Sequence, residues 1–146
     1  MAMDEYFAKY NAERITNVIV PHIIGQQYVA PWGVVPVTLT AGGGAYNWGG
    51  YSADIIAALA IATMFMLHWA VVADADINGH YEIEFYYGAA DTIAAACAFT
   101  RTAPFTASVM VPVKSGVLPA GSRVRARMRH SVGGATALTK IYYHPH

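Results

Sequence analysis

At 146 residues, the chain has the size of a single domain and is long enough to bury a hydrophobic core. Hydrophobic residues make up 55% of it and charged residues only 12%, against a usual charged share of about 25%. We therefore expect part of the surface to be covered by other protein, most simply by identical copies. The net charge is zero, which argues against a nucleic-acid partner, because such proteins usually carry a basic excess.

The charges are distributed unevenly. Residues 1–100 contain all nine acidic residues and two of the nine cationic ones, so their net charge is −7. Residues 101–146 contain the other seven cationic residues and no acid, so their net charge is +7. Halves of opposite charge can neutralise each other within one fold or between subunits.

The N-terminal 33 residues are predicted to form a short helix followed by an extended arm. The helix is indicated by apolar residues at i, i+3, i+4 and i+7, namely Met3, Tyr6, Phe7 and Tyr10. The residues that follow are apolar but interrupted by proline and glycine. Such an arm either crosses its own domain or reaches a neighbouring subunit, and the sequence does not separate the two.

The compartment is predicted from the first residues and from the cysteine content. The first ten residues are acidic and lack a cationic start followed by an apolar run, so we expect no signal peptide and a reducing cytoplasm. Cys97, the single cysteine, lies in an alanine-rich stretch and is expected to be a small buried apolar group.

Strand patterns dominate from residue 34 onward. Apolar residues alternate over 35–40, and Pro36 there indicates a sheet edge. Residues 41–51 form a glycine-rich loop without the Lys-Ser/Thr pair of a phosphate-binding loop. Residues 52–63 are alanine-rich and fit either a helix or a strand.

Residues 64–73 are predicted to be a strand that is apolar on both faces. The two faces are expected to carry Phe65, Leu67, Trp69 and Val71 on one side and Met64, Met66, Ala70 and Val72 on the other. Residues 55–73 are also nearly long enough to span a bilayer. However, no cationic residue flanks them closely, so we expect no membrane partner.

Asn78-Gly79 is typical of a tight hairpin, and further strands are predicted at 81–87, 92–101, 106–113, 123–130 and 136–144. The resulting fold class is all-β, a β-sandwich or jelly roll of about seven to eight strands. The domain division is 1–33 for the helix and arm and 34–146 for the sandwich.

No motif predicts an enzyme, a cofactor or a metal. Asp74, Asp76, Asn78 and Gly79 match the start of a calcium loop, but its twelfth position is Phe85 rather than glutamate. The six histidines are scattered without zinc-site spacing, and no catalytic triad is evident. We therefore expect no catalytic residue and a non-enzymatic function.

The most informative pattern is a row of four arginines on one face of a strand, Arg123, Arg125, Arg127 and Arg129. Like charges spaced about 6.6 Å apart repel and require counter-charges. Glu82 and Glu84 provide an acidic row with the same spacing. The row fits a surface paired within the chain, a ladder between subunits, or phosphate contact.

The last two-thirds of the chain resembles small virion structural proteins of tailed bacteriophages. The resemblance rests on ADINGHYEIEFYYG, CAFTRT and VPVKSGVLPAGSRVRARMRHSVGGATALTKIYYH, within residues 64–144. It is to capsid cement or decoration proteins with a β-sandwich body. It implies a homo-oligomer, often a trimer, bound at junctions between major capsid protein subunits, on the virion surface.

Two functions follow as expectations. The first is a capsid decoration protein whose interface includes Arg123, Arg125, Arg127, Arg129, Glu82, Glu84, Met64, Met66, Trp69, Tyr6 and Tyr10. The alternative is a host-glycan-binding module of a phage tail or fibre, with Tyr46, Trp48 and Tyr51 as its stacking platform. Exposure of this aromatic loop beside a groove would favour the alternative, and burial against a neighbouring chain would favour the first.

Overall fold

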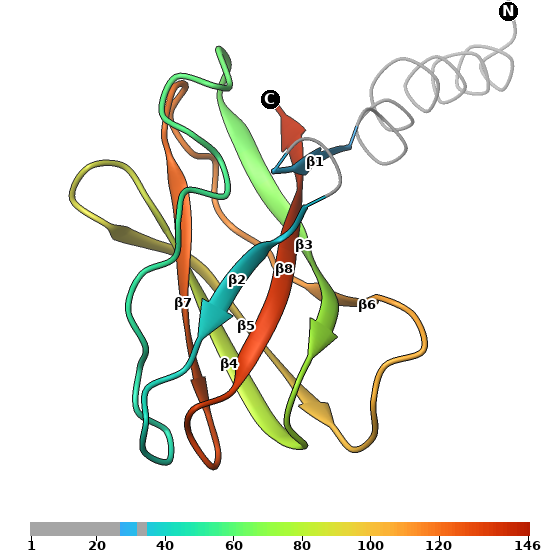
Figure 1. Cartoon of the computed structure of the whole chain (residues 1–146). Coiled ribbons are helices and arrows are strands. Elements are labelled where there is room, and N and C mark those ends of the chain that lie inside the picture. The colour runs from blue at the N-terminus through green and yellow to red at the C-terminus, as the bar shows by residue number, and fades with distance from the viewer. Residues whose placement is uncertain (1–26, 32–34) are drawn as a thin grey trace, which may run out of the picture.

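The protein is a two-sheet β-sandwich in the computed structural model, which describes residues 27–31 and 35–146 (Figure 1). The predicted N-terminal helix, with Tyr6 and Tyr10, lies outside the described residues. The strands are β1 (Tyr28–Ala30), β2 (Val37–Thr40), β3 (Phe65–Ala75), β4 (Gly79–Tyr87), β5 (Thr92–Arg101), β6 (Val109–Pro112), β7 (Val124–His130) and β8 (Thr136–Pro145). The predicted all-β class and strand number are confirmed.

All strand pairs are antiparallel. The larger sheet has the order β1-β8-β3-β6, and β2 also pairs with β8 beside β1. The smaller sheet has the order β5-β4-β7. As Pro36 indicated, β2 is an edge strand, since among the described strands it pairs with β8 alone.

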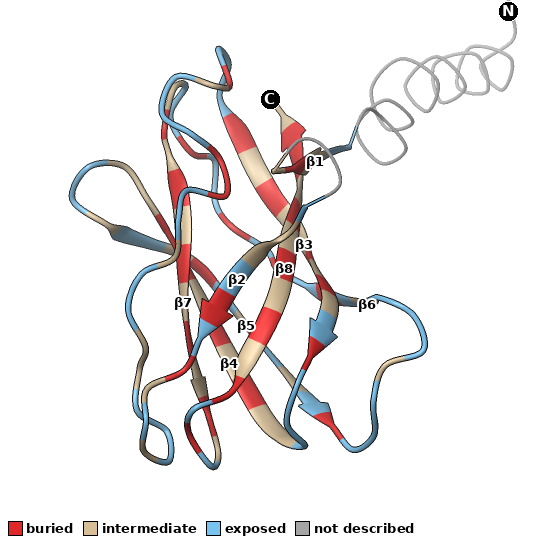
Figure 2. Ribbon diagram, in the orientation of Figure 1, coloured by how far each residue is buried: buried red, intermediate tan, exposed pale blue. Residues whose placement is uncertain are grey.

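The core lies between the two sheets, and in β4 and β7 it follows from the alternation of buried and partly buried side chains (Figure 2). In β4 the inward side chains of Tyr81, Ile83 and Phe85 are fully buried, whereas Glu82 and Glu84 point outward. The inward side chains of β7 are likewise buried between its arginines. Burying each large apolar side chain stabilises the fold by about 1.5–3 kcal/mol, so this alternation fixes which charged residues face solvent.

The predicted faces of the strand at residues 64–73 are wrong because β3 is irregular. Its register against β8 shifts between Leu67 and Trp69 and again between Val72 and Asp74. After the first shift, Ala70 and Val72 become the buried residues, and Trp69 and Val71 are only partly buried. A bulge reverses the inside-outside alternation, and apolar side chains on both faces left no pattern to reveal it.

Asn78-Gly79 does not close a hairpin, contrary to the sequence prediction. β3 belongs to the larger sheet and β4 to the smaller one, so residues 76–78 cross from one sheet to the other. Gly79 has a φ of 142°, and a Cβ atom there would lie 2.5 Å from Nε2 of His130. The glycine is needed because the crossing packs directly against the buried imidazole.

Residues 52–63 are neither helix nor strand. They form turns and bends apart from a single bridge between Ile56 and Val124 of β7. The amide of Ser52 donates to the carbonyl of Ala126 at 2.8 Å, and the amide of Ile55 donates to the carbonyl of Val124 at 2.7 Å. This segment therefore runs along the edge of β7 that does not pair with β4, and it satisfies backbone groups of that edge.

Part of the predicted arm belongs to the domain itself. β1 pairs with β8, Ala30 is fully buried, and the ring of Tyr28 stacks on Tyr143 with centroids 5.6 Å apart. For these residues the interpretation as a strap across the same domain holds. In the described part of the chain, no helix is long and apolar enough to cross a membrane.

Candidate functional site

The outer face of the smaller sheet carries the predicted charged rows, and they pair as the sequence indicated. The register of β4 and β7 places Glu82 opposite Arg129 and Glu84 opposite Arg127. Nη2 of Arg127 lies 3.0 Å from Oε2 of Glu84, and Nε of Arg129 donates to Oε2 of Glu82 at 2.6 Å. The two glutamates thus pair with two of the four arginines within one chain.

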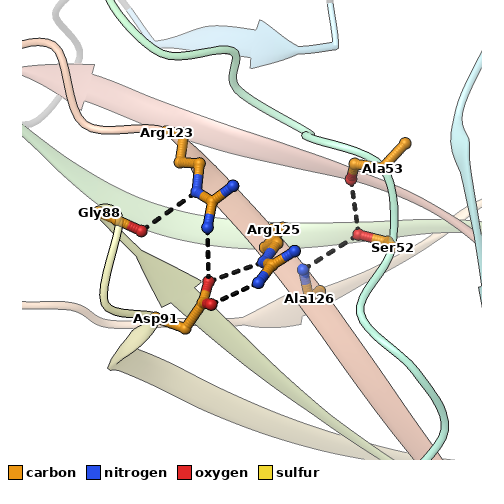
Figure 3. Close-up of polar contacts among 7 residues, drawn as sticks. All are labelled: Ser52, Ala53, Gly88, Asp91, Arg123, Arg125 and Ala126. Atoms are coloured by element: carbon orange, nitrogen blue, oxygen red, sulfur yellow. Dashed lines mark hydrogen bonds and ion pairs between the residues drawn. The ribbon is translucent and has the colours of Figure 1, made fainter.

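The other two arginines share a carboxylate that sequence reasoning missed. Asp91, in the turn between β4 and β5, accepts a 2.7 Å bond from Nε of Arg125 and a 3.3 Å bond from Nη2 of Arg123 (Figure 3). Nε of Arg123 also donates to the carbonyl of Gly88 at 3.1 Å. Asp91 has a φ of 51°, and nothing in its sequence context signalled that the turn would bring it to the arginines.

The pKa values of this face follow from the pairing. The bond from Arg125, with the positive charges of Arg125 and Arg123, lowers the pKa of Asp91. Desolvation and a hydrogen bond to Glu84 raise the pKa of Tyr86 to about 12. The carboxylate of Asp91 therefore stays charged and the phenol of Tyr86 stays neutral at neutral pH.

Three aromatic side chains of the glycine-rich loop, Tyr46, Trp48 and Tyr51, lie over the arginines. The guanidinium of Arg125 is 4.1 Å from the ring centroid of Tyr51. The guanidinium groups of Arg127 and Arg129 are 4.7 and 4.8 Å from the ring centroid of Trp48. Such contacts contribute about 0.5–1 kcal/mol each when exposed. They hold the aromatic rings in place over the charged face.

Backbone bonds fix the position of this loop. The amide of Tyr46 donates to the carbonyl of His130 at 2.8 Å, and the amide of Gly49 donates to the carbonyl of Met128 at 2.9 Å. A Cβ atom at Gly49 would lie 1.7 Å from the carbonyl oxygen of Thr40, so only glycine allows this close approach. The sequence showed the aromatic residues and the glycines, but not that the loop would follow β7.

A shallow groove of about 270 Å³ lies between this loop and β5. It is lined by Trp48, Glu82, Ile83, Glu84, Ala96, Cys97 and Ala98. Ala96 and Ala98 are exposed and small, so they form a low floor beside the carboxylates. Tyr46 and Tyr51 are 46% and 42% exposed, so the aromatic loop is accessible rather than covered by its own domain.

Cys97 lines the groove and is partly buried. Burial raises the pKa of its thiol to about 12, so the thiolate is absent at neutral pH. The sequence predicted a small buried apolar group, and Cys97 does pack against the core but is only partly buried. Among the described residues, no group of three or more His, Cys, Asp or Glu side chains could hold a metal ion.

The remaining predicted site residues lie elsewhere. Met66 and Trp69 are partly buried residues of β3, in the opposite sheet, and Met64 just before β3 is 51% exposed. Of the calcium-like pattern, Asp76 accepts bonds from the amide and the hydroxyl of Thr136 at 2.8 and 2.9 Å. Its carboxylate therefore ties the sheet crossing to β8.

No family model matches the chain, and no curated protein matches it. Solved structures that are similar in fold include two carbohydrate-binding modules. CsCBM6-3 from Clostridium stercorarium in complex with cellobiose has 13% identity and a TM-score of 0.42, covering 80% of this chain and 79% of the other.

The second is the carbohydrate binding module CBM6cm-2 from Cellvibrio mixtus lichenase 5A in complex with cellotriose. It has 16% identity and a TM-score of 0.41, covering 83% of this chain and 87% of the other. Both TM-scores lie below 0.5, a level at which a likeness of chain trace does not transfer a ligand or a site.

Proposed function

We propose that this chain is a non-catalytic carbohydrate-binding domain that holds a polysaccharide along the groove beside Trp48. The observation that carries the proposal is the composition of the groove. An indole ring lies at one side, two arginine-paired carboxylates lie across its width, and two alanines form its floor. Contacts within the chain position the indole ring and the carboxylates.

Each part suits a sugar chain. Sugar rings present C–H groups that pack on aromatic rings, and their hydroxyl groups need hydrogen-bond partners. Carboxylates held by guanidinium groups offer acceptors and donors side by side, and charge-assisted bonds are the stronger ones. The small alanine side chains leave room for a sugar ring to lie on the groove floor. The groove is open, which favours a polymer over an enclosed small molecule.

Exposure of the aromatic loop beside a groove is the feature that was expected to favour glycan binding over capsid decoration. Tyr46 and Tyr51 are exposed, and Trp48 borders the groove. The arginine row, the main candidate for contact with shell subunits, has carboxylate partners within its own chain. Both observations favour the glycan-binding alternative.

The proposal is tested by affinity electrophoresis and calorimetry with soluble glucan, xylan, mannan and polygalacturonate. At least one polysaccharide should bind, with a dissociation constant on the order of micromolar to millimolar. Trp48→Ala should weaken that binding at least tenfold. Trp69→Ala is the matched control, because Trp69 belongs to the opposite sheet, and it should bind as wild type does. No binding to any of the four, or equal binding by Trp48→Ala, would refute the proposal.

Capsid decoration remains a second proposal, supported by the sequence resemblance over residues 64–144. It concerns where the domain is displayed, and a virion protein can also bind host glycans. Mass spectrometry of purified particles would test it: a virion component should be present in many copies per particle. Absence from purified particles would leave the carbohydrate-binding proposal untouched.

A further inference from the structure

β5 has the longest strand edge in the described molecule that lacks backbone hydrogen-bond partners. β5 pairs only with β4, in a sheet where β4 is central. In the described part of the chain, no backbone hydrogen bond joins residues 92–100 to any segment other than β4. A row of backbone N–H and C=O groups along this ten-residue strand is thus open to another strand.

The other sheet edges are shortened, interrupted or covered. β1 has three residues and β2 has four, and the four-residue β6 ends at Pro112. The edge of β7 is bonded by the loop that carries Trp48, through the amides of Gly49 and Ser52. Among the described strands, only β5 combines a long edge with no cover.

β5 also lacks the residues that usually block edge pairing. Thr92 to Thr100 contains no charged residue and no proline. The flanking charges are both engaged within the chain, since Asp91 binds Arg125, and Arg101 is buried and bonded to Asn78. One bulge, at Ala94 where the register with β4 shifts, leaves residues 95–100 as a regular edge.

We propose that β5 pairs antiparallel with β5 of a second copy, forming a twofold dimer with a continuous six-stranded sheet. A twofold operation places the same strand opposite itself, so the pairing must tolerate its own side chains. Here it does, because two uncharged strands meet without like-charge repulsion. The exposed side chains of Ala96 and Ala98 are small enough to lie beside their copies.

The dimer would join two grooves into one. Ala96 and Ala98 form the groove floor next to the free edge, so the second copy's alanines would extend that floor. The joined surface would run from one Trp48 across the dimer axis to the other. This consequence rests on the proposed function, whereas the strand pairing does not, and the result would be a site for a longer chain than one domain can hold.

Sedimentation of the full chain without polysaccharide tests the pairing. Wild type should form a dimer at tens of micromolar, on the order expected for such interfaces. The double variant Ala96→Lys/Ala98→Lys should sediment as a monomer, because lysines would face each other about 5 Å apart across the axis. Ala96→Ser/Ala98→Ser, which stays small and neutral, should remain a dimer.

A mixing experiment separates repulsion from misfolding. Ala96→Glu/Ala98→Glu should also be monomeric alone, but an equimolar mixture with the lysine variant should restore a dimer. A monomeric wild type, a closed trimer, or a lysine variant that remains dimeric would overturn the proposal. Failure of the mixture to associate would do so as well. Because no sugar is present, none of these outcomes depends on carbohydrate binding.

Discussion

At the scale of single residues, His130 is the most consequential buried polar side chain. It is fully buried, it packs on Tyr81 with ring centroids 4.4 Å apart, and its Nδ1 accepts a bond from the amide of Val132 at 3.2 Å. Desolvation lowers its pKa, and the nearby carboxylate of Asp76 only partly opposes this effect. The imidazole is therefore neutral in the folded protein.

This predicts a loss of stability in mild acid. The pKa of His130 is lower when folded than its unfolded value of 6.5, so below that value the unfolded chain binds more protons. The buried neutral imidazole of His130 makes its full contribution to the free energy of unfolding above pH 6.5. That contribution declines as the pH falls, by at most about 1.4 kcal/mol per pH unit.

Urea denaturation at pH 7.5 and 5.5 measures this change. His130→Gln should be less stable than wild type at pH 7.5 but should lose less stability on acidification. His80→Gln is the control, because His80 is partly exposed, and it should follow wild type. The pKa values of Asp76 and Asp91 are lowered below 3.8, so these two carboxylates change the stability of the fold only at more acidic pH. Equal pH dependence in wild type and His130→Gln would contradict this account.

At the scale of elements, the β4–β7 pair determines the charged face. Arg127 pairs with Glu84, and both side chains are partly buried, at 30% and 21% exposure. Desolvation lowers the pKa of Arg127, but the bond to Glu84 raises it, and the net shift is upward. The pairing thus keeps the guanidinium charged beneath Trp48.

A charge swap tests the register. Arg127→Glu should place two carboxylates opposite each other and destabilise the protein by about 1 kcal/mol. The double variant Arg127→Glu/Glu84→Arg should recover a measurable part of that loss in urea denaturation. Combining Arg127→Glu with Glu82→Arg is the mismatched control, because Glu82 pairs with Arg129, and it should recover less. Equal recovery by both combinations would show that the pairing is not specific.

The N-terminal arm gives a second prediction at this scale. Deleting residues 1–26 leaves every described strand, whereas deleting residues 1–30 removes β1 and uncovers the edge of β8 at Ile141 and Tyr143. The longer deletion should therefore have the lower melting temperature. Equal melting temperatures would mean that the pairing of β1 with β8 adds nothing to stability.

Sequence alone predicted those elements whose two faces differ chemically. β4 and β7 alternate apolar with charged residues, so their inward faces could be read directly. Pairing of their charged rows within the chain was one of three alternatives left open by the sequence, and the structure shows it. β3 could not be oriented, because both of its faces are apolar and its bulges have no sequence signal. Asn78-Gly79 showed a turn, but not that the turn changes sheets.

The candidate site was predictable in its parts but not in its assembly. The arginine row, the glutamates and the aromatic loop were each visible in the sequence. Their meeting depends on contacts between residues about 80 positions apart, such as Trp48 over Arg127. Asp91 was missed because a single aspartate in a turn looks like any polar turn residue.

At the scale of the whole molecule, the two sheets have different outer faces. The smaller sheet presents ordered charge pairs, aromatic rings and a groove. The larger sheet presents partly buried apolar residues such as Met66 and Trp69. The chain has few charged residues, and seven of them form the paired row on the smaller sheet, namely Glu82, Glu84, Asp91, Arg123, Arg125, Arg127 and Arg129. Under the proposed function, the sugar chain binds on the β5-β4-β7 face.

The most direct test of the central claim is a residue-by-residue map of where sugar binds. Amide chemical shifts of the labelled protein would be recorded during titration with the polysaccharide that binds in affinity electrophoresis. We predict that the largest changes fall at Trp48, Glu82, Glu84, Ala96 and Ala98, with little change at Met66 and Trp69. Changes confined to the larger sheet, or no changes at saturating polysaccharide, would contradict the account.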